Sequence, residues 1–251
     1  MLAATLTSEP DVVRLRDGRR VSFRTIGSPD GFPVVFMHGA LGSPRWRTPE
    51  LDAVVASLGI RCLAVDRPGF ARSDPCPDRT VADYGADVED LADALGLARF
   101  AVIGVSAGAP FALACGWALP DRVVAVAAAS PLAPYESLRY RVTATSFRVP
   151  VAGPLAFEAF VRLLGARAVT GPRNMMEDIE VCRRPWGFAP ADVQVPVVLW
   201  HGSRDRLVPV AHALRLAAAL PACAVHLESR AGHFFFSRRV ADIIGSLLQA
   251  G

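Results

Sequence analysis

Residues 100–120 constrain the fold of this 251-residue chain more than any other stretch, because none of them is charged. The first part of the stretch is rich in β-branched residues, and the second part is rich in Ala and Leu. A run of this length can span a bilayer, but Gly104, Gly108, Pro110 and Gly116 interrupt it. We therefore interpret it as a buried strand that turns into a buried helix, and not as a membrane span.

Short apolar runs of the same kind alternate with helical patterns along most of the chain. The first two runs flank Asp17-Gly18, which is a hairpin signal. The alternation after this hairpin predicts a mostly parallel sheet with helices on both faces. We expect strands at residues 12–15, 21–26, 34–37, 60–65, 100–105, 123–128, 195–200 and 224–227, and helices at residues 50–58, 83–95, 107–118, 210–220 and 237–248.

The alternation breaks once, between residues 132 and 190. This segment has no convincing strand pattern, and prolines separate its short helical pieces. The whole chain is long enough for one large core. We therefore predict one α/β core formed by residues 1–131 and 191–251, into which residues 132–190 are inserted between two strands.

Ser106 lies at the junction of the expected strand and helix, within the motif Gly-Val-Ser-Ala-Gly of residues 104–108. A serine on so tight a turn needs small neighbours, because its backbone is strained and the strand and helix approach closely. The turn would carry the hydroxyl over the carboxyl ends of the strands, where open α/β sheets bind ligands. Ser106 is therefore the candidate nucleophile. Taken alone, the motif also fits a serine in an ordinary glycine-rich turn.

Asp205 and His233 follow two later strands and are the candidates for activating Ser106. A serine hydroxyl is a poor nucleophile unless a base takes its proton and a third group orients that base. On sheets of this kind the three groups follow one another along the chain as Ser, then Asp or Glu, then His. Because each candidate follows a different strand, we expect all three to converge at one edge of the sheet.

The remaining histidines and acids suit these roles less well. Two of the histidines precede a glycine at a strand end, where packing in the loop is the simpler role, and two fall within an expected helix or strand. Among the acids, Asp66 also ends a strand, but Pro68-Gly69 behind it indicate a structural turn. The four histidines are His38, His201, His212 and His226.

Two backbone N–H groups are candidates for binding the oxyanion that acyl transfer produces. One belongs to Ala107, directly after the candidate nucleophile, and the other is expected in the loop 38–43. We choose Ala40 in that loop, with Leu41 as the near alternative. Each such donor contributes roughly 2.7–4 kcal/mol to catalysis. A plain glycine-containing loop is the simpler interpretation of residues 38–43.

Five motifs together resemble the signature set of the α/β-hydrolase fold superfamily. The resemblance covers residues 11–250 apart from the insertion. It implies an α/β-hydrolase fold: a mostly parallel eight-stranded sheet, helices on both faces, and a small helical lid before the seventh strand. Ala71 stands where glycine is commoner, which alters a structural turn. The motifs are His38-Gly39, the turn 66–73, the serine motif 104–108, residues 201–205 and Gly232-His233.

A serine at the nucleophile position narrows the chemistry that the resemblance implies. The dehalogenase and epoxide-hydrolase branches use an aspartate there, whereas a serine indicates acyl chemistry. The resemblance implies a cofactor-free serine hydrolase of a carboxylic ester, or of a thioester, lactone, amide or diketone carbon–carbon bond. It implies no metal and no organic cofactor. The alternatives are thioesterase or cyclase-type acyl transfer in a biosynthetic pathway, and a non-hydrolytic binder of the same fold.

The inserted segment forms a lid over the site in similar proteins. Its end, residues 184–188, resembles the re-entry segment of many actinobacterial-type members, and the lid is short for the family. Our candidate substrate-binding residues are Leu41, Phe147, Trp186 and Phe234. Packing within the lid is the alternative role for its apolar residues, among which Phe157, Phe160, Met175 and Met176 are further candidates for lining the site.

Composition limits the partners and the location that we expect. The formal net charge is only +3 and no dense Lys/Arg tract occurs, so nucleic acid is not expected. Five scattered cysteines indicate neither a disulfide framework nor a zinc site. Residues 1–10 lack a signal-peptide pattern, so a cytoplasmic protein is the default. We expect a small-molecule acyl substrate, no membrane partner, and a monomer or homodimer. The arginine-rich lid favours an anionic substrate or an acyl carrier, or is simply a solvated surface.

Overall fold

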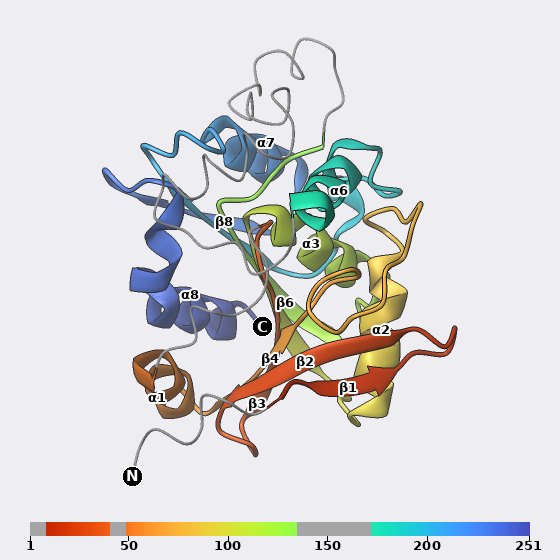
Figure 1. Ribbon diagram of the computed structural model, residues 1–251. Helices are drawn as coiled ribbons and strands as arrows, with labels where there is room; N and C mark the ends of the chain where they lie inside the picture. Colours follow the sequence, from red (N-terminus) through yellow and green to blue (C-terminus); the bar gives the residue numbers. More distant parts are fainter. Residues whose placement is uncertain (1–8, 41–48, 135–171) are drawn as a thin grey trace.

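The chain folds around one eight-stranded sheet (Figure 1). The computed structural model describes residues 9–40, 49–134 and 172–251. In the sheet order β1-β2-β4-β3-β5-β6-β7-β8, β2 pairs antiparallel with β1 and β4, and the other five pairs are parallel. This confirms the predicted mostly parallel sheet that opens with an antiparallel hairpin. The strands are β1 (Asp11–Arg14), β2 (Arg20–Gly27), β3 (Phe32–Met37), β4 (Ile60–Val65), β5 (Phe100–Val105), β6 (Val123–Ala129), β7 (Val197–Gly202) and β8 (Cys223–Glu228).

Helices cover both faces of the sheet, as predicted. α2 and α3 pack on one face together with α6 and α7, whereas α1 and α8 pack on the other. Within the described residues, three short 3₁₀ turns lie between these elements. The helices are α1 (Pro49–Ser57), α2 (Tyr84–Ala94), α3 (Ala109–Ala118), α6 (Pro172–Arg183), α7 (Ala211–Ala219) and α8 (Phe236–Ala250), and the turns are η1 (Ser106–Gly108), η4 (Pro190–Asp192) and η5 (His233–Phe235).

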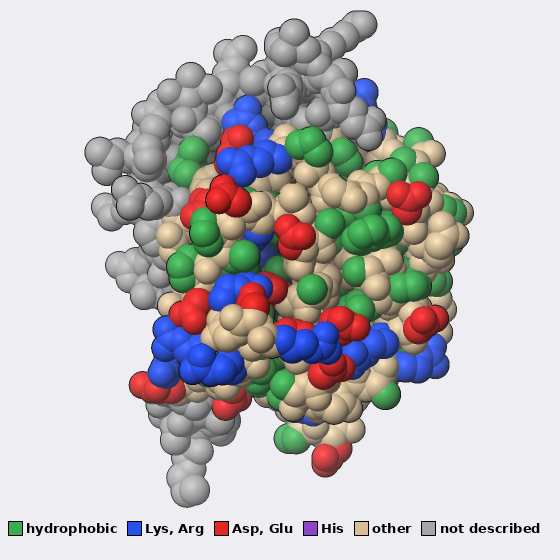
Figure 2. All heavy atoms as spheres, turned by 90° about the vertical axis from the view of Figure 1, so that its right-hand side faces the viewer, with side chains coloured by type: hydrophobic (Ala, Val, Ile, Leu, Met, Phe, Trp, Pro, Cys, Tyr) green, Lys and Arg blue, Asp and Glu red, His purple; other side chains and the backbone are tan. Residues whose placement is uncertain are grey.

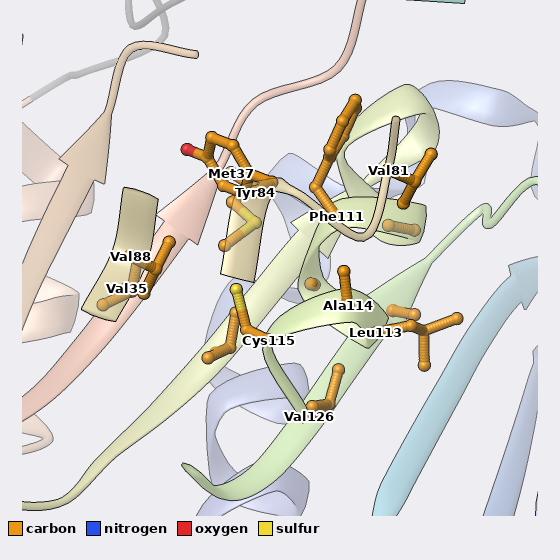
Figure 3. Packing of buried hydrophobic residues seen from close by; sticks show 14 of the residues in the cluster. Val35, Met37, Val81, Tyr84, Val88, Phe111, Leu113, Ala114, Cys115 and Val126 are labelled. Carbon is orange, nitrogen blue, oxygen red and sulfur yellow. The ribbon is translucent and has the colours of Figure 1, made fainter. Parts of the chain in front are cut away.

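Successive residues of the central strands face two separate hydrophobic clusters. In β5, Phe100 and Val102 belong to the cluster under α2 and α3, and Ala101 and Ile103 belong to the cluster under α1 and α8. Figure 3 shows residues of the first cluster, which come together from β3, β6, α2 and α3. Burying one large apolar side chain contributes about 1.5–3 kcal/mol. A strand buried on both faces therefore fixes both helical layers and holds the strand ends in place.

The uncharged stretch 100–120 forms β5, η1 and α3 in succession. This confirms the prediction of a buried strand that turns into a buried helix. Every residue of β5 except Val105 is buried, as are the first eight residues of α3. Among the helices of the described residues, none combines the length and the apolar character that a bilayer span requires.

The strand β7 differs most from its prediction. We expected residues 195–200, whereas the strand spans Val197–Gly202. Proline has no N–H to donate to a ladder, and the carbonyl of Pro196 accepts a hydrogen bond from the N–H of Val126 just before regular pairing begins. At its other end β7 continues through His201, which pairs with Leu227 of β8.

Ion pairs join the N-terminal hairpin to α2 and to the turn after β4. Arg19 binds Asp87 of α2, and Arg20 binds Asp74 at 2.7 Å. Figure 2 views the molecule from this side and shows basic and acidic side chains mixed in a band. Arg20 is exposed, and exposed pairs contribute about 0–1 kcal/mol each. The Arg20–Asp74 pair therefore adds little to stability, whereas Arg19 binds a buried carboxylate, that of Asp87.

The predicted lid lies largely outside the described residues. Its last part is described and contains α6, which ends before Arg184. Ile179, Val181 and Cys182 of this helix are buried in the same cluster as α3. The domain boundaries at residues 131 and 191 remain predictions.

Candidate active site

Ser106 adopts a backbone conformation that few residues other than glycine tolerate. Its φ is 55°, in the left-handed region, and the residue is 8% exposed. The turn needs small neighbours: a Cβ at Gly104 would lie 2.5 Å from the carbonyl oxygen of Gly108. The strained strand-to-helix turn that the motif predicted is therefore present.

The structure brings Ser106, His233 and Asp205 into one chain of hydrogen bonds. The Nε2 atom of His233 lies 3.0 Å from the Oγ atom of Ser106, and its Nδ1 atom lies 2.7 Å from the Oδ2 atom of Asp205. An ionised carboxylate only accepts hydrogen bonds, so Nδ1 carries the imidazole proton and Nε2 is free to accept the serine proton. The three residues follow β5, β7 and β8, whose carboxyl ends meet at one edge.

The carboxylate of Asp205 is buried and fully engaged. Its Oδ1 atom accepts the N–H groups of Leu207 and Val208, each at 2.9 Å, and its Oδ2 atom also lies 3.4 Å from Nε2 of His201. Burial raises the pKa of this carboxyl, but the hydrogen bonds from His233 and the two N–H groups lower the pKa further than burial raises it. Asp205 is therefore held in its ionised form.

The loop after β3 lies directly against the serine. A Cβ built on Gly39 would be 3.3 Å from the Cβ of Ser106. Ala40 and Ala107, the residues predicted to donate N–H groups to an oxyanion, are both buried. Ala40 directly follows Gly39 and Ala107 directly follows Ser106, so the two residues flank the point where the loop meets the serine. Leu41, the alternative donor, lies outside the described residues.

Comparison with known families now identifies the fold. The model of the Alpha/beta hydrolase family matches residues 34–244. The chain belongs to the alpha/beta hydrolase family. Its fold is accordingly the predicted α/β-hydrolase fold.

The relatives of this alpha/beta hydrolase that we compared include three named enzymes. It is 28% identical over 249 residues to 2-hydroxy-6-oxononadienedioate/2-hydroxy-6-oxononatrienedioate hydrolase 2 of Pseudomonas putida, with 84% of this chain and 87% of the relative covered. The carboxylesterase CesB of Bacillus subtilis superposes with a TM-score of 0.74 at 22% identity, covering 98% of this chain and 93% of that one. The enol-lactonase of Burkholderia xenovorans LB400 superposes with a TM-score of 0.72 at 18% identity, covering 95% and 100%. The two structural likenesses show the fold.

The other histidines of the alpha/beta hydrolase are buried or stacked against neighbouring residues. His38 donates from Nδ1 to the carbonyl of Gly39 at 2.8 Å, and His201 donates from Nε2 to the carbonyl of Val208 at 2.9 Å. Burial lowers the pKa of both imidazoles, and for His38 the nearby Arg67 lowers it further. Burial likewise lowers the pKa of His212, in α7, to about 4. These three rings are therefore neutral packing groups at neutral pH.

The turn 66–73 is the structural turn that its sequence indicated. Asp66 is buried and accepts a hydrogen bond from the hydroxyl of Ser22 at 2.7 Å, and Ser73 donates to the Asp66 carbonyl at 2.6 Å. Ala71 has a φ of 45°. That left-handed conformation is the physical reason why glycine is commoner at this position.

The four predicted substrate-binding residues have different positions. Phe234 is 51% exposed and stands edge-on to the ring of His233, with 5.2 Å between the centroids. Trp186 is only 2% exposed; its indole N–H donates to the carbonyl of Cys182 at 3.0 Å, and its ring contacts Phe188. This burial favours the packing alternative for Trp186 over the predicted contact with substrate. Leu41 and Phe147 lie outside the described residues, as do Phe157, Phe160 and the side chain of Met175.

Met176, a further candidate for lining the site, instead lines a groove beside α6. The groove has a volume of about 590 Å³ and lies between this helix and Pro77-Asp78. Ser106, Asp205 and His233 do not line it, and its other side chains are mainly charged. We therefore do not assign the acyl site to this groove.

Sequence reasoning missed a buried ion pair between Arg67 and Asp178, beside the loop that lies against Ser106. Both side chains are 0% exposed. Charged groups are rarely buried unless they are paired, and here each is the partner of the other. A signal was available in α6, where Asp178 stands three and four residues before the buried Val181 and Cys182. An acid on the apolar stripe of a helix indicates a buried cationic partner.

Proposed function

We propose that this protein is a serine hydrolase that cleaves a carboxylic ester through an acyl-enzyme intermediate. The observation that carries the proposal is the hydrogen-bonded chain from Asp205 through His233 to Ser106, with distances of 2.7 and 3.0 Å. Each member is placed for one task in acyl transfer: nucleophile, base and orienting acid. The proposal needs no cofactor, because the serine supplies the nucleophile and water completes the reaction.

The reaction has two halves. In the first, His233 takes the proton of Ser106 while the serine oxygen attacks the ester carbonyl. The tetrahedral intermediate then collapses, and His233 gives the proton to the departing alcohol. In the second, His233 activates a water molecule, which attacks the acyl-enzyme and releases the acid and free Ser106. Asp205 stays ionised throughout and stabilises the imidazolium that forms twice.

The N–H groups of Ala107 and Ala40 are the proposed donors to the oxyanion in both halves. Ala107 follows the nucleophile directly, and Ala40 follows Gly39, which lies against Ser106. Hydrogen-bond donors fixed in advance around a developing charge contribute about 2.7–4 kcal/mol each. The buried position of both residues supports this role, since water competes less for a buried donor.

Phe234 is our proposed apolar contact for the substrate. It is half exposed and lies beside the base, so a group bound near His233 would touch its ring. Burying part of an aromatic ring against a ligand favours apolar or aromatic groups on the ester. Leu41 and Phe147 remain proposed contacts from the sequence alone.

A second candidate is suggested by the Pseudomonas putida relative, whose name gives a 2-hydroxy-6-oxo dienedioate as its substrate. Its 28% identity over most of both chains favours a hydrolase acting on a keto acid. In this chain Ser106, His233 and Asp205 would carry that reaction as well. Thioesterase or cyclase-type acyl transfer uses the same groups as well. Measuring kcat/KM for a series of p-nitrophenyl esters, for carrier thioesters and for a 2-hydroxy-6-oxo dienedioate would rank these substrate classes.

The proposal is tested by labelling with a fluorophosphonate probe, which reacts with an activated serine. Wild-type protein is expected to be labelled at Ser106, and Ser106→Ala is expected to lose the label. Ser130→Ala is the matched control, because Ser130 is also buried at a strand end with a left-handed φ of 47°. Absence of labelling in the wild type, or equal labelling of Ser106→Ala, would overturn the proposal in favour of a non-hydrolytic binder.

A further inference from the structure

Arg67 and Asp178 form a fully buried ion pair beside the loop that carries Ala40. The Nε atom of Arg67 lies 3.3 Å from Oδ1 of Asp178, and its Nη2 atom binds Oδ2. The guanidinium also lies 5.4 Å from the ring centre of Phe70 and 5.1 Å from that of Phe111. Removing two charges from water is costly, and a buried pair is seldom worth more to stability than apolar side chains of equal volume. The pair therefore calls for another explanation.

The remaining donors of Arg67 point to the backbone of the loop after β3. Its Nη1 atom binds the carbonyl of His38, and its Nη2 atom lies 3.5 Å from the carbonyl of Gly39. The backbone N–H of Arg67 donates to Nε2 of His38 at 3.3 Å, which leaves the other ring nitrogen to donate to the Gly39 carbonyl at 2.8 Å. Two successive carbonyls are thus held toward Arg67.

Holding the carbonyl of Gly39 also fixes the direction of the N–H of Ala40. The two groups belong to one planar trans peptide, in which the C=O and N–H bonds point in opposite directions. With the carbonyl turned toward Arg67, the N–H of Ala40 must point away from Arg67. The loop meets Ser106 at Gly39, where an added Cβ would be 3.3 Å from the serine Cβ. If the Gly39–Ala40 peptide were rotated, its carbonyl oxygen would face the position where the oxyanion needs an N–H donor.

Asp178 connects this arrangement to α6, the helix that ends the insertion. The same helix makes two more contacts, one with the turn 66–73 and one with η1: Asn174 donates to the carbonyl of Gly69, and the thiol of Cys182 lies 3.5 Å from the carbonyl of Ala107. Asp178 also accepts from Arg79 at 3.4 Å, and Arg79 binds Glu177 at 3.1 Å. The two arginines and two carboxylates balance in charge.

We propose that Arg67 is a positioning residue for the oxyanion hole, and that Asp178 holds Arg67 in place. Arg67 keeps the Gly39–Ala40 peptide oriented so that its N–H can bind the oxyanion, both by its own contact with the Gly39 carbonyl and by holding His38, whose Nδ1 donates to that carbonyl at 2.8 Å. Asp178 fixes the planar guanidinium by two parallel contacts, which a lysine cannot reproduce. This inference rests on the proposed function, since it assigns a role within the same acyl transfer.

The double variant Arg67→Met/Asp178→Leu tests the role because it removes both charges of the pair together, while Arg79 keeps its ion pair with Glu177. We expect a folded protein whose KM for p-nitrophenyl acetate stays within about two-fold of wild type, while kcat falls about 10²- to 10³-fold, the effect of losing one oxyanion donor. The affinity for phenylboronic acid, whose tetrahedral adduct needs the oxyanion hole, should fall in parallel. The control is Arg79→Met, which removes a buried arginine from Asp178 but none of the contacts to the loop after β3; its kcat should stay near wild type.

Arg67→Lys gives an independent readout should the double variant not fold. It keeps a positive charge opposite Asp178 but loses the forked contact to both carbonyls, so kcat should fall about ten-fold or more with little change in KM. Wild-type kcat and boronate affinity in either folded variant would overturn the inference. If Ser106 is labelled by the fluorophosphonate while kcat does not respond to Arg67, the positioning role fails alone. If wild-type Ser106 is not labelled, the proposed function fails first.

Discussion

The two buried carboxylates next to the site, Asp205 and Asp178, are held in different ways. Asp205 is satisfied mainly by its own loop, through N–H groups two and three residues away, and by His233. Asp178 is satisfied by Arg67, which is 111 residues away in the sequence. The partner of Asp205 is an imidazole, which can lose its proton, whereas a guanidinium stays charged at any ordinary pH. Loss of Asp205 should therefore affect mainly chemistry, whereas loss of Asp178 should affect folding in addition to the positioning of Arg67.

The largest expected effect is that of Asp205→Asn on turnover. An amide at this position can bind the wrong tautomer of His233, with Nε2 protonated and unable to accept the serine proton. We expect kcat for p-nitrophenyl acetate to fall about 10⁴-fold, with the thermal midpoint within a few degrees of wild type. A loss below about ten-fold would show that Asp205 does not orient the base.

The next effect is that of Asp178→Ala on stability. The variant leaves the guanidinium of Arg67 buried without its carboxylate, which costs about 3–5 kcal/mol. Urea unfolding followed by circular dichroism measures this free energy directly. Asp205→Ala is the comparison, because its partner His233 can remain neutral. If Asp205→Ala lowers the free energy of unfolding as much as Asp178→Ala does, the distinction between the two carboxylates is wrong.

Acid should weaken the molecule through its buried neutral imidazoles. The pKa of His212 is lowered to about 4 by burial, so between pH 6.5 and 4 the unfolded chain binds a proton there that the folded chain does not. Stability must therefore fall as the pH falls through this range. For this one group the loss between pH 7 and pH 5 is about 2 kcal/mol.

Unfolding measured at both pH values in wild type and His212→Gln checks this assignment. The side chain of Gln can still accept the N–H of Ala133, which His212 accepts at Nδ1 over 3.0 Å. The variant should lose less stability between pH 7 and pH 5 than wild type does. An identical loss in both proteins would assign the acid sensitivity to other groups, such as His38 and His201.

The smallest effect is expected at Phe234. Replacing this half-exposed ring by alanine should lower kcat/KM about five-fold for p-nitrophenyl butyrate, equal to about 1 kcal/mol of contact, and less for the acetate. Leu248→Ala is the control, since Leu248 is an exposed apolar residue near the other end of α8. Equal effects of both substitutions would remove Phe234 from the proposed substrate contacts.

The same contrast explains which parts could be predicted from the sequence. The strands and the positions of Ser106, Asp205 and His233 depend on local patterns: apolar runs, glycine-flanked turns and residues that follow a strand end. The Arg67–Asp178 pair depends on a contact between distant segments, and no local pattern fixes which arginine meets which acid. The role of Trp186 could not be decided for a related reason, because the local sequence around an aromatic residue is the same whether its ring contacts the ligand or the core.

The contacts of α6 have a practical consequence for exchanging the predicted lid, residues 132–190, with that of another member of this fold. A chimera joined at residue 190 would replace α6 together with the rest of the predicted insertion, and would import whichever residue the donor carries at the position of Asp178. A junction before Pro172 would keep the native carboxylate and its arginine. The segment to exchange in such a chimera therefore ends before α6, at residue 171.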